Sequence, residues 1–392
     1  MDISKITATE QISEIISGFT IAILLIPESI AFSFILGLPS SVGLQSTMIM
    51  SSITSIFGGC PGLISGSTAA VATSLSGVTT FVGKEYIFLA VIMGGMIQIL
   101  MGITGISKYI NNIPKSVTSG FLIALGILIL LSQLENLKDV NGKWLESDQM
   151  SYTLLLTIIA TIVSIFGILL FRFKNFTNID INIPGGLLAI GIIILLTYFF
   201  SGINVQLVSS RGHIQSKLPV LQIPKSDFSF MNILKTLPFS IAMAIAGLTE
   251  SLLMVKETSK AFKIPDNSFQ ENIVQGICNI LSGFTGGIGG CVLIGQSKFN
   301  LENGSKTRLS SISCAIFFIL FVLFCGNTIE KIPIPAIIGI MITIALKTGD
   351  WKALYKKIDK DWITTLVTSL SGIFSGSLSL GIIIGSLVHT FI

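Results

Sequence analysis

Two glycine clusters, each followed by hydroxyl, thiol or amide side chains, are the features of this sequence best suited to bind a ligand. The first reads FGGCPGLISGS over 57–67, and the second reads FTGGIGGCVLIGQS over 284–297. Glycine at this density opposes a continuous helix, because each interior glycine costs up to about 1 kcal/mol relative to alanine. Helix-compatible sequence resumes after each cluster, which predicts two half-helices that begin inside apolar segments.

The start of each half-helix is suited to an anion. A helix N-terminus presents unpaired N–H groups and about half a positive charge. Two such termini that face each other would bind an anion without a buried lysine. They are expected at 66–69 and at 290–293, the second beginning with Gly290. The hydroxyls of Ser67 and Thr68 could add donors. The alternative is that the glycines only allow close helix packing, as small residues do in membranes.

Two acids, Glu28 and Glu250, lie in the middle of apolar segments. A charge at the centre of a membrane costs about 2.5–3.5 kcal/mol on insertion scales, so an acid there is a functional candidate. A buried carboxylate can bind a cation or take up a proton, and either event would offset the charge of a co-transported anion. The alternative is a protonated, hydrogen-bonded structural glutamate at each position.

The composition requires a lipid environment. The chain has 392 residues, of which 51% are hydrophobic and 11% charged, and its mean hydropathy is +0.84. Soluble domains carry about 25% charged residues. No Asp, Glu, Lys or Arg occurs between Glu28 and Lys84 or after Asp361. We therefore expect an integral protein of the cell membrane, with the lipid bilayer as its surroundings.

Other classes of protein are disfavoured. The net charge of +4 does not indicate nucleic-acid binding, because the basic residues lie in short loops between apolar segments. The five cysteines form no CxxC pair and are expected to be small buried apolar side chains rather than metal ligands. No HExxH or GxSxG motif occurs, and no histidine in an apolar segment has a Ser or Asp partner in a motif, so an enzyme is not expected.

Apolar segments follow one another along the whole chain, and several are too short to cross a membrane as straight helices. If all fourteen cross from a cytoplasmic N-terminus, sixteen of the 24 lysine and arginine residues fall in cytoplasmic loops and eight outside. Cytoplasmic loops carry the excess of Lys and Arg, so both termini are predicted to be cytoplasmic. The segments lie near 13–36, 44–57, 66–82, 86–106, 116–133, 151–171, 183–201, 236–255, 270–284, 290–300, 309–327, 332–347, 361–375 and 377–392.

The chain contains an internal repeat. Residues 19–22 read FTIA and residues 239–242 read FSIA, each is followed by an acid-serine pair, and a glycine cluster comes some thirty residues later. The pairs are Glu28-Ser29 and Glu250-Ser251. Seven crossings per copy is an odd number, so the second copy must be inverted, and inverted repeats with broken helices are typical of transporters. We expect one all-α polytopic domain over 1–392, with repeats at about 10–205 and 233–392.

Several stretches, taken in order, resemble the SulP family of inorganic anion transporters. They are GFTIAILLIPESIAFSFILGLPSSVGL from residue 18, ISGSTAAVA at 64–72, TESLL at 249–253 and NIVQGICNILSGFTGGIGGCVLIGQSKFNLENGSKTRLSSIS at 272–313. The resemblance implies fourteen spans, broken in spans 3 and 10. It also implies a core of spans 1–4 and 8–11 that moves like an elevator against a gate of spans 5–7 and 12–14, and a homodimer.

The resemblance also assigns roles to residues, with three departures from the family pattern. It places Thr68 and Ala69 on one side of the anion, and Cys291, Val292 and Leu293 on the other. Glu250 matches an acid that coordinates sodium in some members, and Glu28 a position that is often Gln or Glu. The departures are Gln296 where many members have an Arg, Met254 where the sodium site has a hydroxyl, and a chain that stops without a STAS domain. A thioether is a poor sodium ligand, which favours a proton over sodium.

We therefore predict a transporter that couples uptake of a small inorganic oxyanion, such as bicarbonate or sulfate, to sodium or protons through Glu250, with no other cofactor. A dicarboxylate or nucleobase transporter of the same fold is an alternative. The windows 64–72 and 288–297 contain no aromatic residue, which counts against a nucleobase. An uncoupled anion channel is a further alternative.

Overall fold

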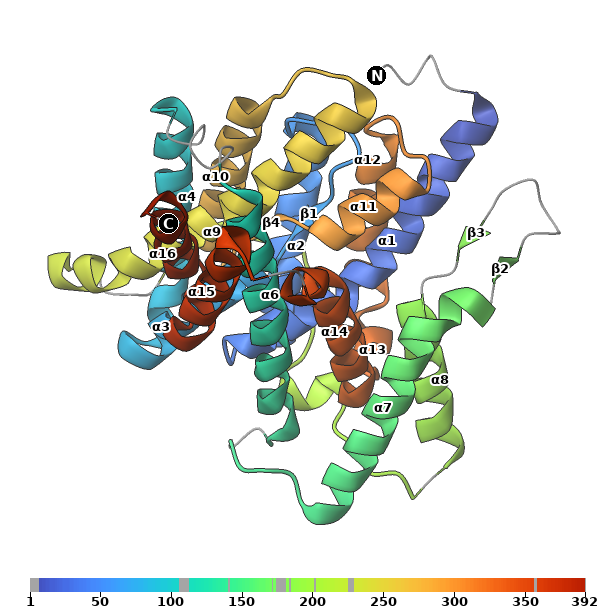
Figure 1. The fold of residues 1–392 in the computed structure, drawn as a ribbon. Coiled ribbons are helices and arrows are strands. Elements are labelled where there is room, and N and C mark those ends of the chain that lie inside the picture. Colours follow the sequence, from blue (N-terminus) through green and yellow to red (C-terminus); the bar gives the residue numbers. More distant parts are fainter. Residues whose placement is uncertain are drawn as a thin grey trace.

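A computed structural model describes the chain at residues 7–105, 113–139, 142–170, 172–173, 181–182, 185–200, 202–224, 229–355 and 358–391. It is mostly helical (Figure 1). The α-helices are α1 Ala8–Ile35, α2 Ser40–Phe57, α3 Ala69–Phe81, α4 Ile87–Ile103, α6 Lys115–Ser132, α7 Ser147–Leu170, α8 Gly185–Phe199, α9 Phe230–Phe262, α10 Ser268–Phe284, α11 Ile294–Glu302, α12 Leu309–Phe324, α13 Gly326–Ile329, α14 Ile334–Thr348, α15 Lys360–Ser375 and α16 Leu378–Phe391.

Short strands and 3-10 turns connect these helices. Strands β1 Ser65–Gly66 and β4 Cys291–Val292 pair with each other, as do β2 Arg172–Phe173 and β3 Ile181–Asn182. The turns are η2 Lys84–Tyr86, η3 Gln133–Leu137, η4 Val208–Arg211 and η5 Trp351–Tyr355. The predicted all-α fold is therefore interrupted by two very short antiparallel pairs, and the first of them lies at the site.

Each predicted apolar segment coincides with a helix or with a strand followed by a helix. Five of the described helices are long and apolar enough to cross a membrane, and five more are shorter apolar helices. The fourteen crossings and the inverted repeat stay predictions. The segment ends predicted at 106, 171, 183, 201 and 392 lie outside the described residues, as do Lys5, Lys108, Lys174, Lys225, Lys356 and Lys357 from the orientation count.

Local sequence explains how the first helix starts and where it is weakened. Thr7 caps α1, and Glu10 completes a capping box by accepting from the Thr7 backbone N–H at 2.8 Å. Pro27 lies inside α1, directly before Glu28. Proline has no N–H, so the carbonyl four residues earlier loses its usual helical partner. Helix α1 continues through this point but lacks one backbone hydrogen bond close to the buried acid.

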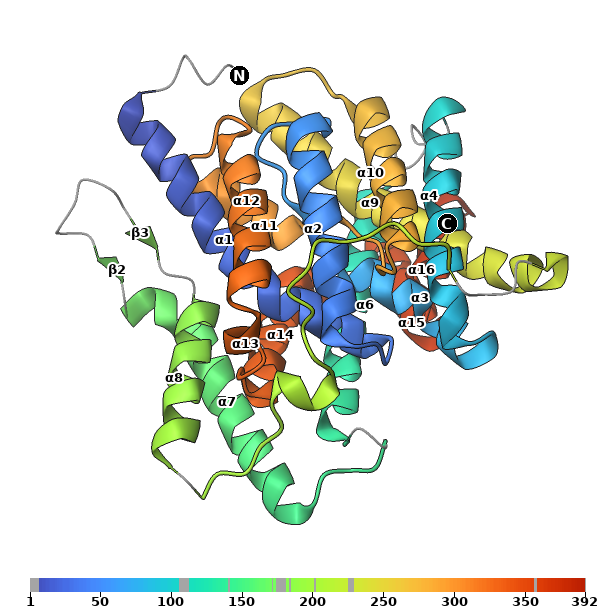
Figure 2. The same ribbon diagram turned by 180° about the vertical axis from the view of Figure 1, so that it is seen from behind.

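The helices pack into two groups. In the first, α4 packs against α9 and α10, and α1 packs against α2 and α12. In the second, α6 packs against α14, α15 and α16, while α7 packs against α8 and α14, to one side of the molecule (Figures 1 and 2). We call the set α1–α4 with α9–α12 the core group, and the set α6–α8 with α14–α16 the gate group. Motion of one group against the other stays a prediction.

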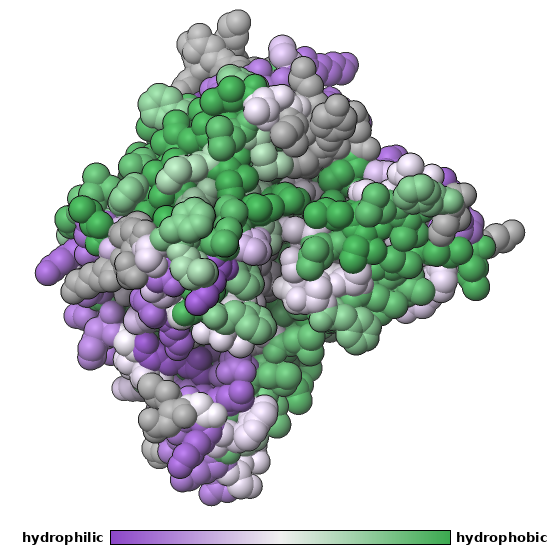
Figure 3. Space-filling view, turned by 90° about the vertical axis from the view of Figure 1, so that its left-hand side faces the viewer, coloured by the Kyte–Doolittle hydropathy of each residue, from purple (hydrophilic) through white to green (hydrophobic). Residues whose placement is uncertain are grey.

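Large apolar side chains are exposed around the molecule. Phe81, Phe230, Phe374 and Phe391 each have more than three quarters of their surface exposed. Figure 3 shows one face, on which apolar residues form a broad area and hydrophilic residues gather toward its lower part. A soluble monomer rarely exposes apolar area on this scale, whereas lipid chains accommodate it.

Candidate functional site

The two glycine clusters meet at the centre of the molecule. Strands β1 and β4 pair antiparallel, with Ser65 opposite Val292 and Gly66 opposite Cys291. Their packing requires glycine, because a Cβ on Gly290 would lie 1.9 Å from the Gly66 carbonyl oxygen. The pair brings the starts of α3 and α11 close together, near the labels β1 and β4 in Figure 1.

The second half-helix begins at Ile294, a little later than the sequence predicts. Cys291 and Val292 continue in the extended conformation and pair with β1, and the Leu293 N–H donates to the Ile64 carbonyl at 2.8 Å. Leu293 is the N-cap of α11, and no side chain in the described part of the chain caps this helix. Because Leu293, Ile294, Gly295 and Gln296 all line the cavity described below, the first turn of α11 offers uncapped N–H groups to a ligand.

Polar side chains on α2 and α10 support the crossing strands. The Ser67 N–H donates to Thr47 Oγ1 at 3.0 Å, and the Ser67 hydroxyl lies 2.9 Å from the same oxygen. On the other side, Asn279 Oδ1 accepts from the Gly290 N–H at 2.8 Å, and Asn279 Nδ2 donates to the Gly290 carbonyl at 3.1 Å. Unwound backbone at membrane depth needs such partners, because no water or regular helix supplies them.

Sequence analysis did not identify Thr47 or Asn279 as part of the site. Gln275 also supports this region, because its Nε2 donates to Ser65 Oγ at 2.9 Å and to Glu271 Oε1 at 2.7 Å. One feature of the sequence could have identified these residues. The apolar helix before each glycine cluster has a polar face. That face holds Thr47 in α2, and Gln275 and Asn279 in α10.

A cavity of about 250 Å³ lies between the core group and the gate group. Its lining includes six of the predicted site residues, which come from α1, α3, α9 and the β4–α11 segment. They are Glu28, Thr68, Ala69, Glu250, Leu293 and Gln296. Helices α6, α7, α8 and α14 of the gate group close the cavity with residues such as Leu125, Ser164 and Thr343. The structure therefore gathers both buried acids and both half-helix starts around one space.

Other predicted residues lie behind the lining rather than in it. Ser67 is turned to Thr47, and Gly290 packs on β1. The Val292 N–H donates to Ser251 Oγ at 3.2 Å. Val292 also packs with Met254 in a small apolar cluster, where the Met254 side chain is buried away from the cavity.

Cys291 connects the two parts of the predicted site. Its Sγ donates to Glu250 Oε2 at 2.8 Å and lies 3.1 Å from Thr68 Oγ1. Thr68 is the N-cap of α3, and its hydroxyl accepts from the Val71 N–H at 3.4 Å. A hydrogen-bonded chain thus runs from the start of α3 through the thiol to the acid that the sequence assigns to the coupling ion.

Among the described residues, Glu28 has one hydrogen-bonding partner for its two oxygens. Gln296 Nε2 donates to Glu28 Oε1, while Glu28 Oε2 is buried and without a partner among the described residues. The resemblance to the SulP family places Gln296 where many members have an arginine. Instead of a charged pair, the described part of the chain therefore has an amide donating to an acid whose other oxygen is left for a proton or cation.

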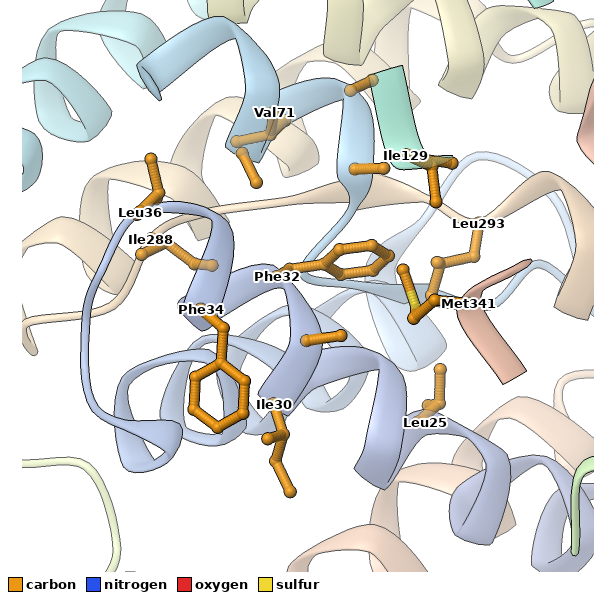
Figure 4. Packing of buried hydrophobic residues seen from close by; sticks show 14 of the residues in the cluster. Leu25, Ile30, Phe32, Phe34, Leu36, Val71, Ile129, Ile288, Leu293 and Met341 are labelled. Carbon is orange, nitrogen blue, oxygen red and sulfur yellow. The ribbon is translucent and has the colours of Figure 1, made fainter. Parts of the chain in front are cut away.

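The apolar wall of the cavity includes aromatic residues that the sequence windows did not contain. Phe32 and Phe299 both line the cavity. Figure 4 shows Phe32 of α1 beside Ile129 of α6, Leu293 and Met341 of α14, so the core and gate groups meet in an apolar contact here. The two windows therefore do not describe the whole cavity wall, because α1 and the end of α11 bring in aromatic side chains from outside them.

A second, larger cavity of about 700 Å³ lies at the other end of α3. Ser74, Ser76, Thr79 and Thr80 of α3 line it, together with residues of α9 and of the α15–α16 turn. It too lies between the two helix groups. The Ser379 hydroxyl of α16, in the gate group, donates to the Ala242 carbonyl of α9, in the core group, at 2.5 Å.

The sequence matches a known family over nearly all of its length. Residues 12–370 match the Sulfate permease family. The chain belongs to this family. It is 33% identical over 378 residues to "Putative sulfate transporter YbaR" of Bacillus subtilis, covering 96% of this chain and 75% of that protein. It is 26% identical over 357 residues to the bicarbonate transporter BicA of Picosynechococcus sp., covering 87% of this chain and 62% of that protein.

Two solved structures share the fold. The transmembrane domain of a cyanobacterial bicarbonate transporter BicA superposes with a TM-score of 0.78 at 22% identity, covering 98% of this chain and 99% of that one. SLC26A9 superposes with a TM-score of 0.77 at 18% identity, covering 97% of this chain and 65% of that one. The chain is thus a multi-pass membrane protein of a non-enzymatic anion transporter family.

Proposed function

We propose that this protein is a cation-coupled symporter of a small inorganic oxyanion, with bicarbonate and sulfate as the substrates to test first. The observation that carries the proposal is the cavity where two half-helix starts and two buried acids converge between two helix groups. Relatives named as sulfate and bicarbonate transporters support the substrate class.

The anion would bind at the start of α11 and beside Thr68. The uncapped N–H groups of the α11 first turn and the Thr68 hydroxyl are donors on the cavity wall. Donors of this kind bind an anion without carrying a full charge themselves, which permits release on the other side of the membrane. No described residue places a guanidinium in this cavity, so the half-helix termini would carry much of the binding.

The two acids would make anion binding depend on a cation. Glu28 and Glu250 are 3% and 5% exposed, so water screens their charges poorly. With both acids ionised, an oxyanion would enter a cavity that already holds two negative charges on its inner wall. A proton or sodium ion at Glu250, and a second at Glu28, would remove that repulsion. We therefore infer that the cation binds before the anion.

The two cavities suggest how the path alternates between the two sides. Both lie between the core group and the gate group, and α3 lines one with its start and the other with its end. An elevator-type movement of the core group would carry Thr68 and Glu250 from the first cavity toward the second. We place the protein in the cell membrane with both termini cytoplasmic, and we expect a homodimer, which cross-linking in native membranes would test.

The test is uptake of labelled bicarbonate and of labelled sulfate into proteoliposomes, under a sodium gradient and separately under a proton gradient. Glu250→Gln is compared with the parent. We expect one gradient to drive saturable uptake in the parent and Glu250→Gln to lose that dependence. If the variant keeps the parent's dependence on the gradient, Glu250 is not the coupling residue.

The same assay separates the alternatives. Uptake of a dicarboxylate or nucleobase with neither inorganic anion moved would assign a different substrate, and Phe32 and Phe299 give a nucleobase two rings to stack on. Anion current that persists at full size without either gradient would identify a channel.

A further inference from the structure

The cavity that holds the acids also has two lysines in its lining, both at one end. They are Lys298 of α11 and Lys347 of α14. The Lys298 side chain is 48% exposed and Lys347 is also exposed, whereas Thr68, Glu28 and Glu250 are buried. The lysines therefore mark the open mouth of the cavity, and the acids mark its closed inner end. In the proposed orientation this mouth is cytoplasmic.

Lys347 belongs to the face of α14 that forms the cavity wall. Ile340, Thr343, Ile344 and Lys347 all line the cavity, and their spacing of three and four residues places them on one side of a helix. Lys347 is also in the last turn of α14, where a cation interacts favourably with the helix dipole. That local effect alone would not require the side chain to line a cavity.

The two lysines differ in their partners. Lys298 Nζ forms an ion pair with Glu257 Oε2 at 3.3 Å. Lys347 has no ion pair with any carboxylate among the described residues. An ammonium group that already has a carboxylate partner adds little net positive charge to its surroundings. Within the described lining of the cavity, Lys347 is thus the cation whose charge remains free to act on an anion.

The charges in the cavity give this lysine a role. Glu28 and Glu250 lie at the inner end, and Gln296 supplies no charge to oppose them. An oxyanion arriving from the mouth meets a repulsive potential unless a cation stands on its path, and clefts lined with opposite charge concentrate such ions. Lys347 is on that path.

This inference rests on the proposed function. We propose that Lys347 is an anion-binding residue that contacts the anion from one side of the membrane only. The sidedness follows from its position. Thr68, Glu250 and Gln296 belong to the core group, whereas Lys347 belongs to the gate group. When the core group moves, the anion moves with its α3 and α11 donors and leaves Lys347 behind. Lys347 therefore attracts the anion at the cytoplasmic mouth and does not contact it when the site faces outward.

The experiment measures KM for the transported anion from each side, in inside-out vesicles and in intact cells. Lys347→Gln is compared with the parent, with Lys347→Arg, and with Lys352→Gln, which removes an exposed lysine outside the cavity. We expect Lys347→Gln to raise KM from the cytoplasmic side about fivefold to tenfold, as loss of one charged contact does, with KM from outside within about twofold of the parent. Lys347→Arg and Lys352→Gln should retain the parent values on both sides.

Two results would overturn the proposal. One is an unchanged cytoplasmic KM in Lys347→Gln, and the other is an equal rise in KM from both sides, which would indicate a general effect on folding or rate. Protein amount and melting temperature in detergent are measured for every variant, so a folding defect in Lys347→Gln is visible. If the parent itself transports neither anion, the proposed function fails, and this outcome is distinct from both of the others.

Discussion

Replacing Asn279 tests whether the crossing strands depend on the side chains that support them. Asn279 makes three hydrogen bonds, with the Gly290 N–H at 2.8 Å, the Gly290 carbonyl at 3.1 Å and Gln98 Oε1 at 2.8 Å. Leucine has the same number and branching of side-chain heavy atoms and can make none of these bonds. In Asn279→Leu, the Gly290 N–H, the Gly290 carbonyl and the Gln98 oxygen lose these partners. Each orphaned buried group costs about 1–3 kcal/mol, so we expect a loss of about 3–9 kcal/mol in stability.

The same helix provides a matched control. Asn272 is also fully buried in α10, but neither its Oδ1 nor its Nδ2 has a hydrogen-bond partner among the described residues. Asn272→Leu therefore removes a buried polar group without breaking a hydrogen bond. Burying an unpaired amide is unfavourable, so this variant should be as stable as the parent or more stable. The two substitutions change the same residue type to leucine in one helix and differ mainly in the hydrogen bonds that are lost.

Stability is measured by SDS titration of the purified protein, and transport by uptake into proteoliposomes. We expect Asn279→Leu to unfold at lower SDS and to lose most of its transport, because β4 and the start of α11 are no longer fixed. Asn272→Leu should retain both. Equal stability of the two variants would refute the reasoning, as would an Asn279→Leu protein that keeps the parent's unfolding midpoint.

Two further predictions concern Gly290 and Cys291, at the start of β4. Gly290→Ala should abolish transport and reduce the amount of folded protein, because the new Cβ would lie 1.9 Å from the Gly66 carbonyl oxygen. Gly295→Ala is the control, because its new Cβ would meet open space and the variant should fold normally. The yield of each variant from size-exclusion chromatography measures the difference. Cys291→Ala should lower the cation concentration for half-maximal uptake about fivefold, because the thiol hydrogen bond that stabilises ionised Glu250 is lost, whereas Cys291→Ser should not lower it. An unchanged cation dependence in Cys291→Ala would contradict the assigned role of the thiol.

The half-helices could be predicted from sequence because their signals are local. Glycine density around Pro61 and around Gly287 argues against helix whatever the rest of the chain does, and the structure has both breaks. The two central acids were equally visible, since any ionisable residue in an apolar segment is conspicuous. Glu28 and Glu250 do line one cavity. Local rules could not fix where the second half-helix begins, because Cys291 and Val292 are held extended by pairing with residues far away in sequence.

The cavity itself was less predictable, because distant segments build it. Phe32, Lys347 and Thr343 line it, yet nothing in their immediate sequence distinguishes them from other residues of apolar helices or helix ends. Their position depends on how the gate group packs on the core group. That packing cannot be read from any short stretch of a single sequence. The same holds for Thr47 and Asn279, whose importance lies in the strands they touch rather than in a motif.

Four deeply buried acids show why composition and depth alone cannot identify a coupling residue. Glu14 accepts from the Lys306 and Thr307 N–H groups at 2.7 and 2.9 Å and from the Thr307 hydroxyl at 2.5 Å. Glu271 accepts from the Gly59 N–H at 2.6 Å and from Gln275 at 2.7 Å. Both acids use both oxygens to hold loops and the first glycine cluster.

Glu28 and Glu250 are buried to a similar extent but differ in their partners. Glu28 Oε2 has no partner among the described residues, and the donor to Glu250 is a thiol, which is a weak one. Both also line the cavity, whereas Glu14 and Glu271 do not. A buried carboxylate whose oxygens are all satisfied by the fold gains little from a cation. One that is left underpaired beside a cavity gains a great deal, and this difference supports the proposal that the coupling cation binds at Glu250 and Glu28.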